Sequence, residues 1–325
     1  MTQSLLEPPT VRAQATPAQR LRNSTAAVRV SLRWLGVRKT LTPEQKTQAA
    51  ESFGAEGDYL SARKKLLDTR HPAYKDVTAV RGKVLAYWKG CTLPFPEPGI
   101  RLIRQQQLGE FNQKLLDLRV ELHDAVVQLD RRYGELRSAA QQRLGRLYNP
   151  ADYPTSLEGL FEIDWDWPSV EPPDYLLQLS PDLYEQERSR VSARFEEAVQ
   201  LAEQAFLSEF AKLVAHLTER LDSAGSERKV FRDSAVANLT EFFGRFRSLN
   251  VRSNQELDDL VAQAQRAVQG IRPQALRDSQ TLRQQVTAQL SRVQTAVDSM
   301  LVDQPRRRIV RSMASGNGGG HATPH

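Results

Sequence analysis

The most regular hydrophobic pattern in the chain runs from residue 104 to residue 147. Its apolar side chains recur every three or four residues, which keeps them on one face of an α-helix, and they are Leu108, Phe111, Leu115, Leu118, Leu122, Val126, Leu129, Tyr133, Leu136, Ala140, Leu144 and Leu147. No proline interrupts the run, and Asn149-Pro150 ends it. The pattern predicts one helix of about 40 residues, roughly 60 Å long at about 1.5 Å per residue.

A second long run covers residues 181–222, with Leu183 and Val191 near its start and Leu221 near its end. Because each helix needs a cover for its apolar stripe, we expect the two to pack as an antiparallel hairpin over residues 104–222. Residues 223–304 are expected to pack on this bundle as three shorter helices, near 227–248, 254–269 and 274–302.

The pattern changes to a period of two near the N-terminus. Val28, Val30, Leu32 and Trp34 alternate with polar residues, which is typical of a strand with one buried face. A strand needs a partner, and residues 100–103, after a proline-rich turn, are the best candidate. We therefore expect a small β-ribbon in a basic α+β region that covers residues 25–103.

Three helices are expected between these two strands. Thr42-Pro43-Glu44-Gln45 carries a capping threonine, a proline at the first helical position and a glutamine three residues after the cap. A second helix is expected to start near Asp58 and to contain Arg63-Lys64-Lys65, and a third covers residues 72–88. The predicted fold class is mainly α: an elongated antiparallel, coiled-coil-like bundle with a small N-terminal β-ribbon and flexible termini.

The two ends and one connector lack a sustained period. Residues 1–24 are expected to form a disordered arm, and residues 305–325 a disordered basic tail rich in glycine and histidine. The connector at 148–179 is rich in proline, acids and aromatics, and is longer than compact folds normally use, which indicates a packed or functional role. Its aromatics either cover the helix seam, the interpretation we favour, or anchor a protein partner; they are Tyr153, Phe161, Trp165, Trp167 and Tyr175.

Composition narrows the class of protein. The 325 residues are 40% hydrophobic, enough for a real core. No apolar run approaches the roughly 18 residues of a membrane span, and no signal peptide is recognised at the N-terminus. The single cysteine, Cys91, excludes an internal disulfide. We expect a cytoplasmic protein without a membrane partner.

Charge is distributed unevenly. Residues 1–104 hold 18 Lys and Arg against 8 Asp and Glu, whereas residues 105–180 hold 7 against 13. The basic clusters suggest phosphate contact, and interspersed aromatics suggest base stacking. The candidate nucleic-acid contacts are Arg33, Arg38, Lys39, Arg63, Lys64, Lys65, Arg306, Arg307 and Arg308. The alternatives are a solvated surface, or pairing of the basic regions with the acidic middle of the chain.

The sequence contains no recognisable catalytic centre. Glu162, Asp164 and Asp166 alternate, so an extended segment would direct all three carboxylates to one side, as metal-dependent phosphoryl chemistry requires. They lack a basic catalytic partner, so a solvated loop is the favoured interpretation. No P-loop, GxGxxG turn or GxSxG elbow is present. We predict no catalytic, metal or cofactor-binding residue and no cofactor.

Several short blocks match one family pattern: residues 31–39 (SLRWLGVRK), 93–103, 152–154 and 172–175, and 229–238 (KVFRDSAVAN). Through them the chain resembles a bacterial and phage domain-of-unknown-function family, whose members tend to lie in mobile elements beside MoxR- or CobS-like AAA+ ATPases and von Willebrand factor A proteins. The resemblance implies a helical architecture and a partner of one of these kinds. It implies no catalytic residue.

Two functions follow as hypotheses. The first is a non-enzymatic interaction or adaptor protein for an AAA+ ATPase or a von Willebrand factor A protein, with self-association through the long helices as a further option. The alternative is a nucleic-acid-binding accessory protein that uses the basic N-terminal region. A metal-dependent nuclease built on the acidic connector ranks third.

Overall fold

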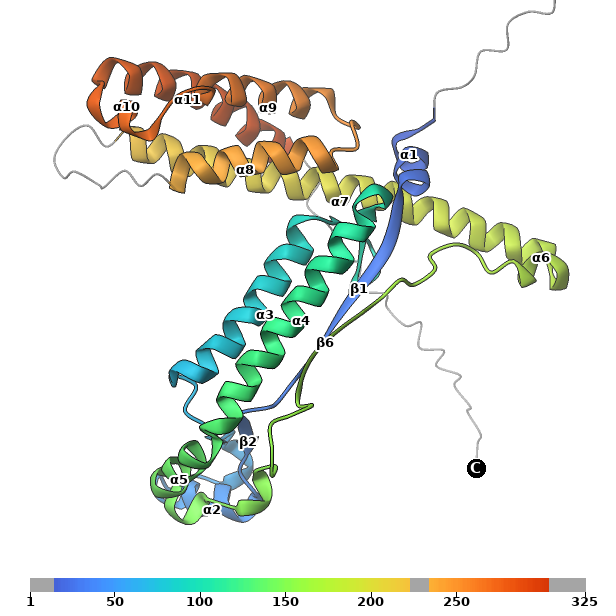
Figure 1. Ribbon diagram of the computed structural model, residues 1–325. Helices are drawn as coiled ribbons and strands as arrows, with labels where there is room; N and C mark the ends of the chain where they lie inside the picture. The colour runs from blue at the N-terminus through green and yellow to red at the C-terminus, as the bar shows by residue number, and fades with distance from the viewer. Residues whose placement is uncertain (1–14, 223–233, 304–325) are drawn as a thin grey trace, which may run out of the picture. The chain divides into compact units, whose positions relative to one another are not determined.

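The computed structural model describes residues 15–222 and 234–303 (Figure 1). The fold is mainly α-helical, and the described chain divides into two compact units. Unit 1 contains the residues up to 206 and residues 241–255; unit 2 contains 207–240 and the residues from 256 onward. The division falls within α7 (Pro181–Asp222) and α8 (Ser234–Leu249), and after the first residue of α9 (Gln255–Val268).

The centre of unit 1 is a four-stranded antiparallel sheet with the strand order β4-β5-β1-β6. The strands are β1 (Thr25–Trp34), β4 (Leu93–Pro94), β5 (Ile100–Arg104) and β6 (Phe161–Asp166). The predicted pairing of the first strand with residues 100–103 is confirmed, with Arg29 opposite Ile100. The predicted ribbon of two strands is part of a larger sheet, because β6, from the aromatic connector, pairs with the other edge of β1.

Helices α3 (Pro72–Gly90) and α4 (Leu108–Arg131) lie side by side in unit 1 (Figure 1). Their apolar faces form one core with the sheet, and the fully buried members include Val28, Val77, Ile103 and Leu115. Each such side chain stabilises the fold by roughly 1.5–3 kcal/mol relative to an exposed position. The predicted helix over residues 72–88 is confirmed.

The prediction of one helix from 104 to 147 is wrong. After α4 the chain makes a turn at Arg132, with φ −97° and ψ 0°, and resumes as α5 (Tyr133–Leu144) in a different direction (Figure 1). The stripe from Phe111 to Ala140 is nevertheless buried. A one-residue turn with nearly helical angles keeps the three-four spacing in phase, so the spacing cannot reveal it. The expected hairpin with residues 181–222 is also wrong, because α4 packs mainly on α3.

The N-terminal part of unit 1 contains three further helical pieces and a second sheet. Its elements are α1 (Pro17–Ser24), β2 (Arg38–Thr40), α2 (Pro43–Glu51), the 3-10 turn η1 (Gly57–Tyr59) and β3 (Arg63–Lys65). The predicted start of α2 is confirmed, including the reciprocal capping by Thr42 and Gln45.

Two expectations for this part of the chain are wrong. Arg63-Lys64-Lys65 forms a strand paired with β2, and residues 17–24 of the expected arm form a helix; residues 1–14 lie outside the described ranges.

The connector is ordered by its packing in unit 1. It contains the 3-10 turn η4 (Pro150–Asp152), strand β6 and the short helix α6 (Tyr175–Leu179); the remaining 3-10 turns are η2 (Gln105–Gln107) and η3 (Gly145–Leu147). Phe161 and Ile163 of β6 are buried in the core, which accounts for the strand. The favoured solvated loop at Glu162, Asp164 and Asp166 is therefore wrong, since all three lie in β6.

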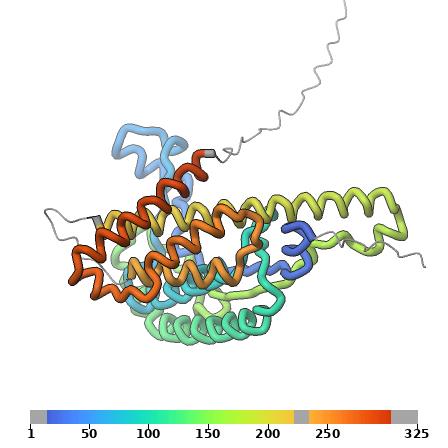
Figure 2. Tube along the Cα trace, turned by 90° about the horizontal axis from the view of Figure 1, so that it is seen from above, coloured from blue at the N-terminus to red at the C-terminus, as the bar shows by residue number. Residues whose placement is uncertain are grey.

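Unit 2 is helical in its described part. The helices that lie wholly or mostly in it are α9 (Gln255–Val268), α10 (Pro273–Asp278) and α11 (Gln280–Asp303) (Figure 2). Its buried side chains include Val261, Ala264, Leu290 and Val297. The single helix expected at 274–302 is divided at Ser279, which has extended backbone angles. No helix within 15–222 and 234–303 is both long and apolar enough to cross a membrane. The expected tail, 305–325, lies outside these ranges.

Candidate functional site

Strands β2 and β3 bring two of the predicted basic clusters together. They pair antiparallel, with Arg38 opposite Lys65, Lys39 opposite Lys64 and Thr40 opposite Arg63. Successive side chains of a strand point to opposite faces. Lys39 and Lys64 therefore share one face, called the inner face below, while Arg38, Arg63 and Lys65 share the other, the outer face. Residues 38–40 and 63–65 together are called the basic ribbon.

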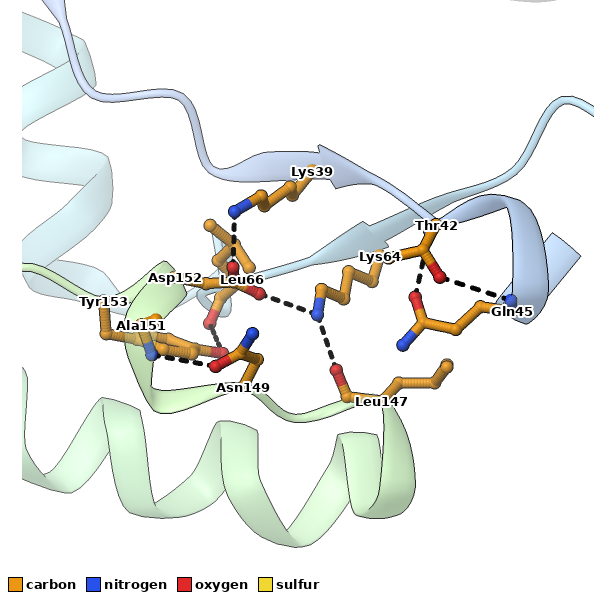
Figure 3. A network of polar contacts seen from close by, with 10 residues as sticks. All are labelled: Lys39, Thr42, Gln45, Lys64, Leu66, Leu147, Asn149, Ala151, Asp152 and Tyr153. Atoms are coloured by element: carbon orange, nitrogen blue, oxygen red, sulfur yellow. Dashed lines mark hydrogen bonds and ion pairs between the residues drawn. The ribbon is translucent and has the colours of Figure 1, made fainter.

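Both lysines of the inner face pair with one carboxylate (Figure 3). Asp152 Oδ1 lies 2.5 Å from Lys39 Nζ, and Asp152 Oδ2 lies 2.7 Å from Lys64 Nζ. Lys64 also donates a hydrogen bond of 2.6 Å to the carbonyl of Leu147. The side chains of Lys64 and Asp152 are only 6% and 2% exposed, so this ion pair is buried. Two predicted nucleic-acid contacts, Lys39 and Lys64, therefore have a structural role.

The turn that carries Asp152 is held by neighbouring polar contacts (Figure 3). The side chain of Asn149 accepts a 3.0 Å hydrogen bond from the Ala151 amide, and the Tyr153 hydroxyl donates one of 3.0 Å to the Leu66 carbonyl. Hydrogen bonding to Lys39 and then to Lys64 lowers the pKa of Asp152 below its usual value. The acidic connector thus compensates the basic N-terminal region at this point, as one sequence-based alternative proposed.

The outer face of the basic ribbon has no such compensation. Arg38, Arg63 and Lys65 are all exposed, and none forms an ion pair with another residue in the described ranges. Like charges directly opposite each other on a ribbon repel, and Arg38 and Lys65 are such a pair. This face therefore presents uncompensated positive charge. The candidate contacts Arg306, Arg307 and Arg308 lie outside the described residues.

The acidic residues of β6 face arginines of β1. The register places Asp166 opposite Arg29, Asp164 opposite Ser31 and Glu162 opposite Arg33. Arg29 pairs with Asp166, and Arg33 Nη1 lies 3.0 Å from Glu162 Oε2, so the candidate contact Arg33 is part of a cross-strand ion pair. Within the described part of the chain, no group of three or more His, Cys, Asp or Glu is arranged to hold a metal ion.

An open groove of about 560 Å³ lies beside β6, between this strand and α4. Its lining mixes basic and acidic residues with a histidine: Arg119, His123, Glu158 and Asp164 are among them. Apolar side chains, among them Leu122, Val126 and Phe161, line it as well, and neither charge sign dominates, so the groove does not favour one ligand chemistry. Cys91 lies elsewhere, where its thiol donates a 3.0 Å hydrogen bond to the Tyr87 carbonyl and burial raises its pKa to about 12. The thiol therefore stays protonated at neutral pH.

Four of the five connector aromatics contact other parts of unit 1. Tyr153 and Phe161 are buried, and the Phe161 ring lies 5.1 Å from that of Trp34. Trp165 donates a 3.0 Å hydrogen bond from Nε1 to Asn112 of α4. Trp167 is 42% exposed, and its ring lies 6.0 Å from that of Phe111. These contacts agree with a role in covering the helices.

The fifth aromatic, Tyr175, has a different environment. It is 62% exposed, and three other large apolar side chains nearby are also exposed: Leu177 at 53%, Leu179 at 77% and Leu183 at 49%. No residue from 173 to 190 is buried. We call residues 173–190 the apolar arm. Pairing between Arg22 and Glu171 fixes the chain just before the arm, and the buried Val191 fixes it again afterwards.

The hydrophobic pattern of the sequence does not predict most of the apolar arm. Leu183 was assigned to the buried stripe of the second long helix, and Leu177 and Leu179 were not singled out. The available signal was the run Leu176-Leu177-Gln178-Leu179 directly before Ser180-Pro181, an apolar cluster with no predicted partner. Burial along a helix depends on what packs against it, and neither spacing nor composition specifies where that packing begins.

Comparison with known proteins adds no identification: no family model, curated protein or solved structure matches the chain. The resemblance to the domain-of-unknown-function family, and the partners that it implies, stay predictions.

Proposed function

We propose that this chain is a non-enzymatic interaction protein, an adaptor that docks on a protein partner through the apolar arm. The observation that carries the proposal is the exposure of Tyr175, Leu177, Leu179 and Leu183 on a segment with no buried residue. Contiguous exposed apolar side chains mark interaction surfaces in folded proteins. Tyr175 and Leu179 are four residues apart on α6, a spacing that places them on one helix face.

The charges around the arm specify the chemistry of the partner. The arm contains four acidic and two basic residues, and its two glutamates, Glu185 and Glu187, pair with Arg188 and Arg190. Its other two acidic residues, Asp174 and Asp182, form no ion pair with any residue in the described ranges. Complementary potentials steer association and select the partner. The arm therefore suits a surface that presents apolar side chains flanked by lysine or arginine.

The partner class comes from the family resemblance, which implies a MoxR- or CobS-like AAA+ ATPase. This assignment is a proposal that rests on the matching blocks alone. A von Willebrand factor A protein is the second candidate from the same source. In either case the role of this chain is to bind its partner and position it. The proposal requires no reaction at any residue of this chain.

The proposal is tested by titrating the full chain into a purified MoxR- or CobS-like AAA+ ATPase from the same organism and measuring heat of binding. Leu177→Asp combined with Leu179→Asp should weaken binding at least tenfold, equivalent to about 1.4 kcal/mol. Both positions are exposed, so the variant should keep its circular dichroism spectrum and melting temperature.

The matched control is Val120→Asp, which alters another exposed apolar side chain, 61% exposed, on α4. The control should bind as the unmodified chain does. If the arm variant binds as tightly as the control, the arm is not the docking surface. If neither the ATPase nor the von Willebrand factor A protein binds the unmodified chain, the partner assignment is wrong.

A further inference from the structure

We infer that the outer face of the basic ribbon binds the phosphate backbone of a nucleic acid. This inference goes beyond the adaptor function and uses a different part of the molecule. It rests on a contrast within one small element: the two faces of the same ribbon each carry cations opposite one another, and only one face has its counter-ion.

On the inner face, two lysines that lie opposite each other on the paired strands bind one carboxylate between them. Lys39 and Lys64 are cross-strand neighbours, and the two oxygens of Asp152 each take one ammonium group. The carboxylate lies between the two ammonium groups and offsets their repulsion. The outer face has the same cross-strand geometry at Arg38 and Lys65, and no carboxylate within the described chain fills the equivalent position.

The spacing of the cations on the outer face is close to the spacing of phosphates along a nucleic acid. Directly opposed side chains have Cβ atoms about 4.5–5.5 Å apart, and diagonal neighbours lie about 7–8 Å apart. Arg38, Lys65 and Arg63 therefore form a compact group of three positive charges. A nucleic-acid strand carries one phosphate about every 3.4 Å along a duplex axis, so three successive phosphates extend over about 7 Å and can contact the group at once. Two arginines supply planar groups that bind phosphate oxygens in pairs.

The segment between the two strands limits where the contact lies. It exposes two aromatic rings, Phe53 at 84% and Tyr59 at 88%, which are available for base stacking. It also exposes Glu51, Glu56 and Asp58, which repel a phosphate backbone. The phosphate contact is therefore placed on the strands themselves, and a single strand, whose bases are free to stack, is favoured over a duplex.

The test measures fluorescence anisotropy of labelled 20-nucleotide single-stranded and duplex oligonucleotides with the full chain, at about 50 and 200 mM salt. Three neutralised phosphates give slopes of about −2.1 for a single strand and −2.7 for a duplex in a plot of log affinity against log salt. Affinity should therefore fall roughly 20- to 40-fold over this interval. The combined variant Arg38→Glu, Arg63→Glu and Lys65→Glu should lose binding at least tenfold at the lower salt.

Two control variants test whether a loss of affinity comes from the ribbon itself or from the change in net charge. Lys75→Glu, Lys114→Glu and Arg131→Glu together reverse three exposed helix cations, the same change in net charge, and should leave most of the affinity. The single change Lys65→Glu places a carboxylate opposite Arg38, so it should lower affinity without lowering the melting temperature. If Lys65 had a purely structural role, this variant would instead have a lower melting temperature.

The outcomes decide the inference directly. Tighter binding of the single strand supports base stacking, and equal binding of both oligonucleotides supports a backbone contact without stacking. The inference is overturned if no binding occurs at about 50 mM salt, where the electrostatic attraction is strong. It is also overturned if the helix control loses as much affinity as the ribbon variant, or if polyglutamate competes as well as an oligonucleotide of equal charge.

Discussion

Asp152 is the single residue on which the basic ribbon depends most. Its carboxylate is the only counter-ion that the described chain offers to Lys64, whose side chain is 6% exposed. Asp152→Ala should therefore destabilise the protein by roughly 3–5 kcal/mol, the cost of leaving one partner of a buried ion pair without the other. Urea denaturation would measure this change.

The matched control is Glu162→Ala, which removes an ion pair whose side chains are 70% and 45% exposed. Exposed pairs contribute about 0–1 kcal/mol. Equal losses of unfolding free energy in the two variants would contradict the account of Asp152 as a buried anchor.

The same residue gives the protein a defined response to acid. Hydrogen bonds from Lys39 and Lys64 hold the pKa of Asp152 below its usual value, which is about 3.9 in an unfolded chain. The charged carboxylate therefore stabilises the fold above that pH, and its contribution is lost as the pH falls through the lowered folded-state pKa. The difference in unfolding free energy between the unmodified chain and Asp152→Asn should be constant near neutral pH and shrink below about pH 4. A difference that persists unchanged to pH 2 would exclude this origin.

These residue-scale roles were only partly predictable. The basic residues were identified as a group, but their division into two faces requires the strand pairing of β2 and β3. The sequence-based prediction placed Arg63-Lys64-Lys65 in a helix together with Leu66-Leu67. Nothing in the local sequence indicates that these residues pair with β2 as a strand. The counter-ion is nearly ninety positions away in the chain, and no local pattern links Asp152 to Lys64.

At the scale of elements, β6 explains the connector tryptophans. Trp165 lies on the inward-facing side of β6, beneath Arg119 and hydrogen-bonded to Asn112, and Trp167 packs on Phe111. Changing both tryptophans to alanine should lower the unfolding free energy by about 3 kcal/mol, the lower end of the range for large aromatic truncations, because both are partly exposed. Thermal unfolding would detect the shift.

Tyr175→Ala provides the comparison within the same connector. Tyr175 is 62% exposed, so its truncation should change the unfolding free energy by less than about 0.5 kcal/mol. An unchanged melting temperature in the double tryptophan variant, together with loss of a bound partner, would instead make the tryptophans a docking site.

The elements differ in how far their sequences determine them. Capping signals located α2 correctly, and two-residue alternation located β1. Its partner β5 was located by the proline-rich turn that precedes it. The break at Arg132 was invisible because its backbone angles are nearly helical and the apolar stripe continues in phase. Helix pairing failed for a related reason: a stripe shows that a helix must be covered, and does not show which helix covers it.

For the whole molecule, the uneven charge distribution is partly compensated within unit 1. Arg29 and Arg33 pair with β6, and Lys39 and Lys64 pair with Asp152, so the acidic connector offsets part of the charge of the basic N-terminal region. The outer face of the basic ribbon is a cluster of cations that no ion pair compensates within the described residues. The sequence predicted the mainly helical class, whereas the exposed apolar arm depends on packing that spacing does not encode.

The central claim is that the apolar arm is the docking surface for a protein partner. Hydrogen–deuterium exchange of the full chain, with and without the purified AAA+ ATPase, tests it most directly, because amide protection reports the contact site without any substitution. The account predicts that added protection is concentrated in residues 173–190. Binding that leaves these amides unchanged, or that protects α3 and α4 instead, would contradict it.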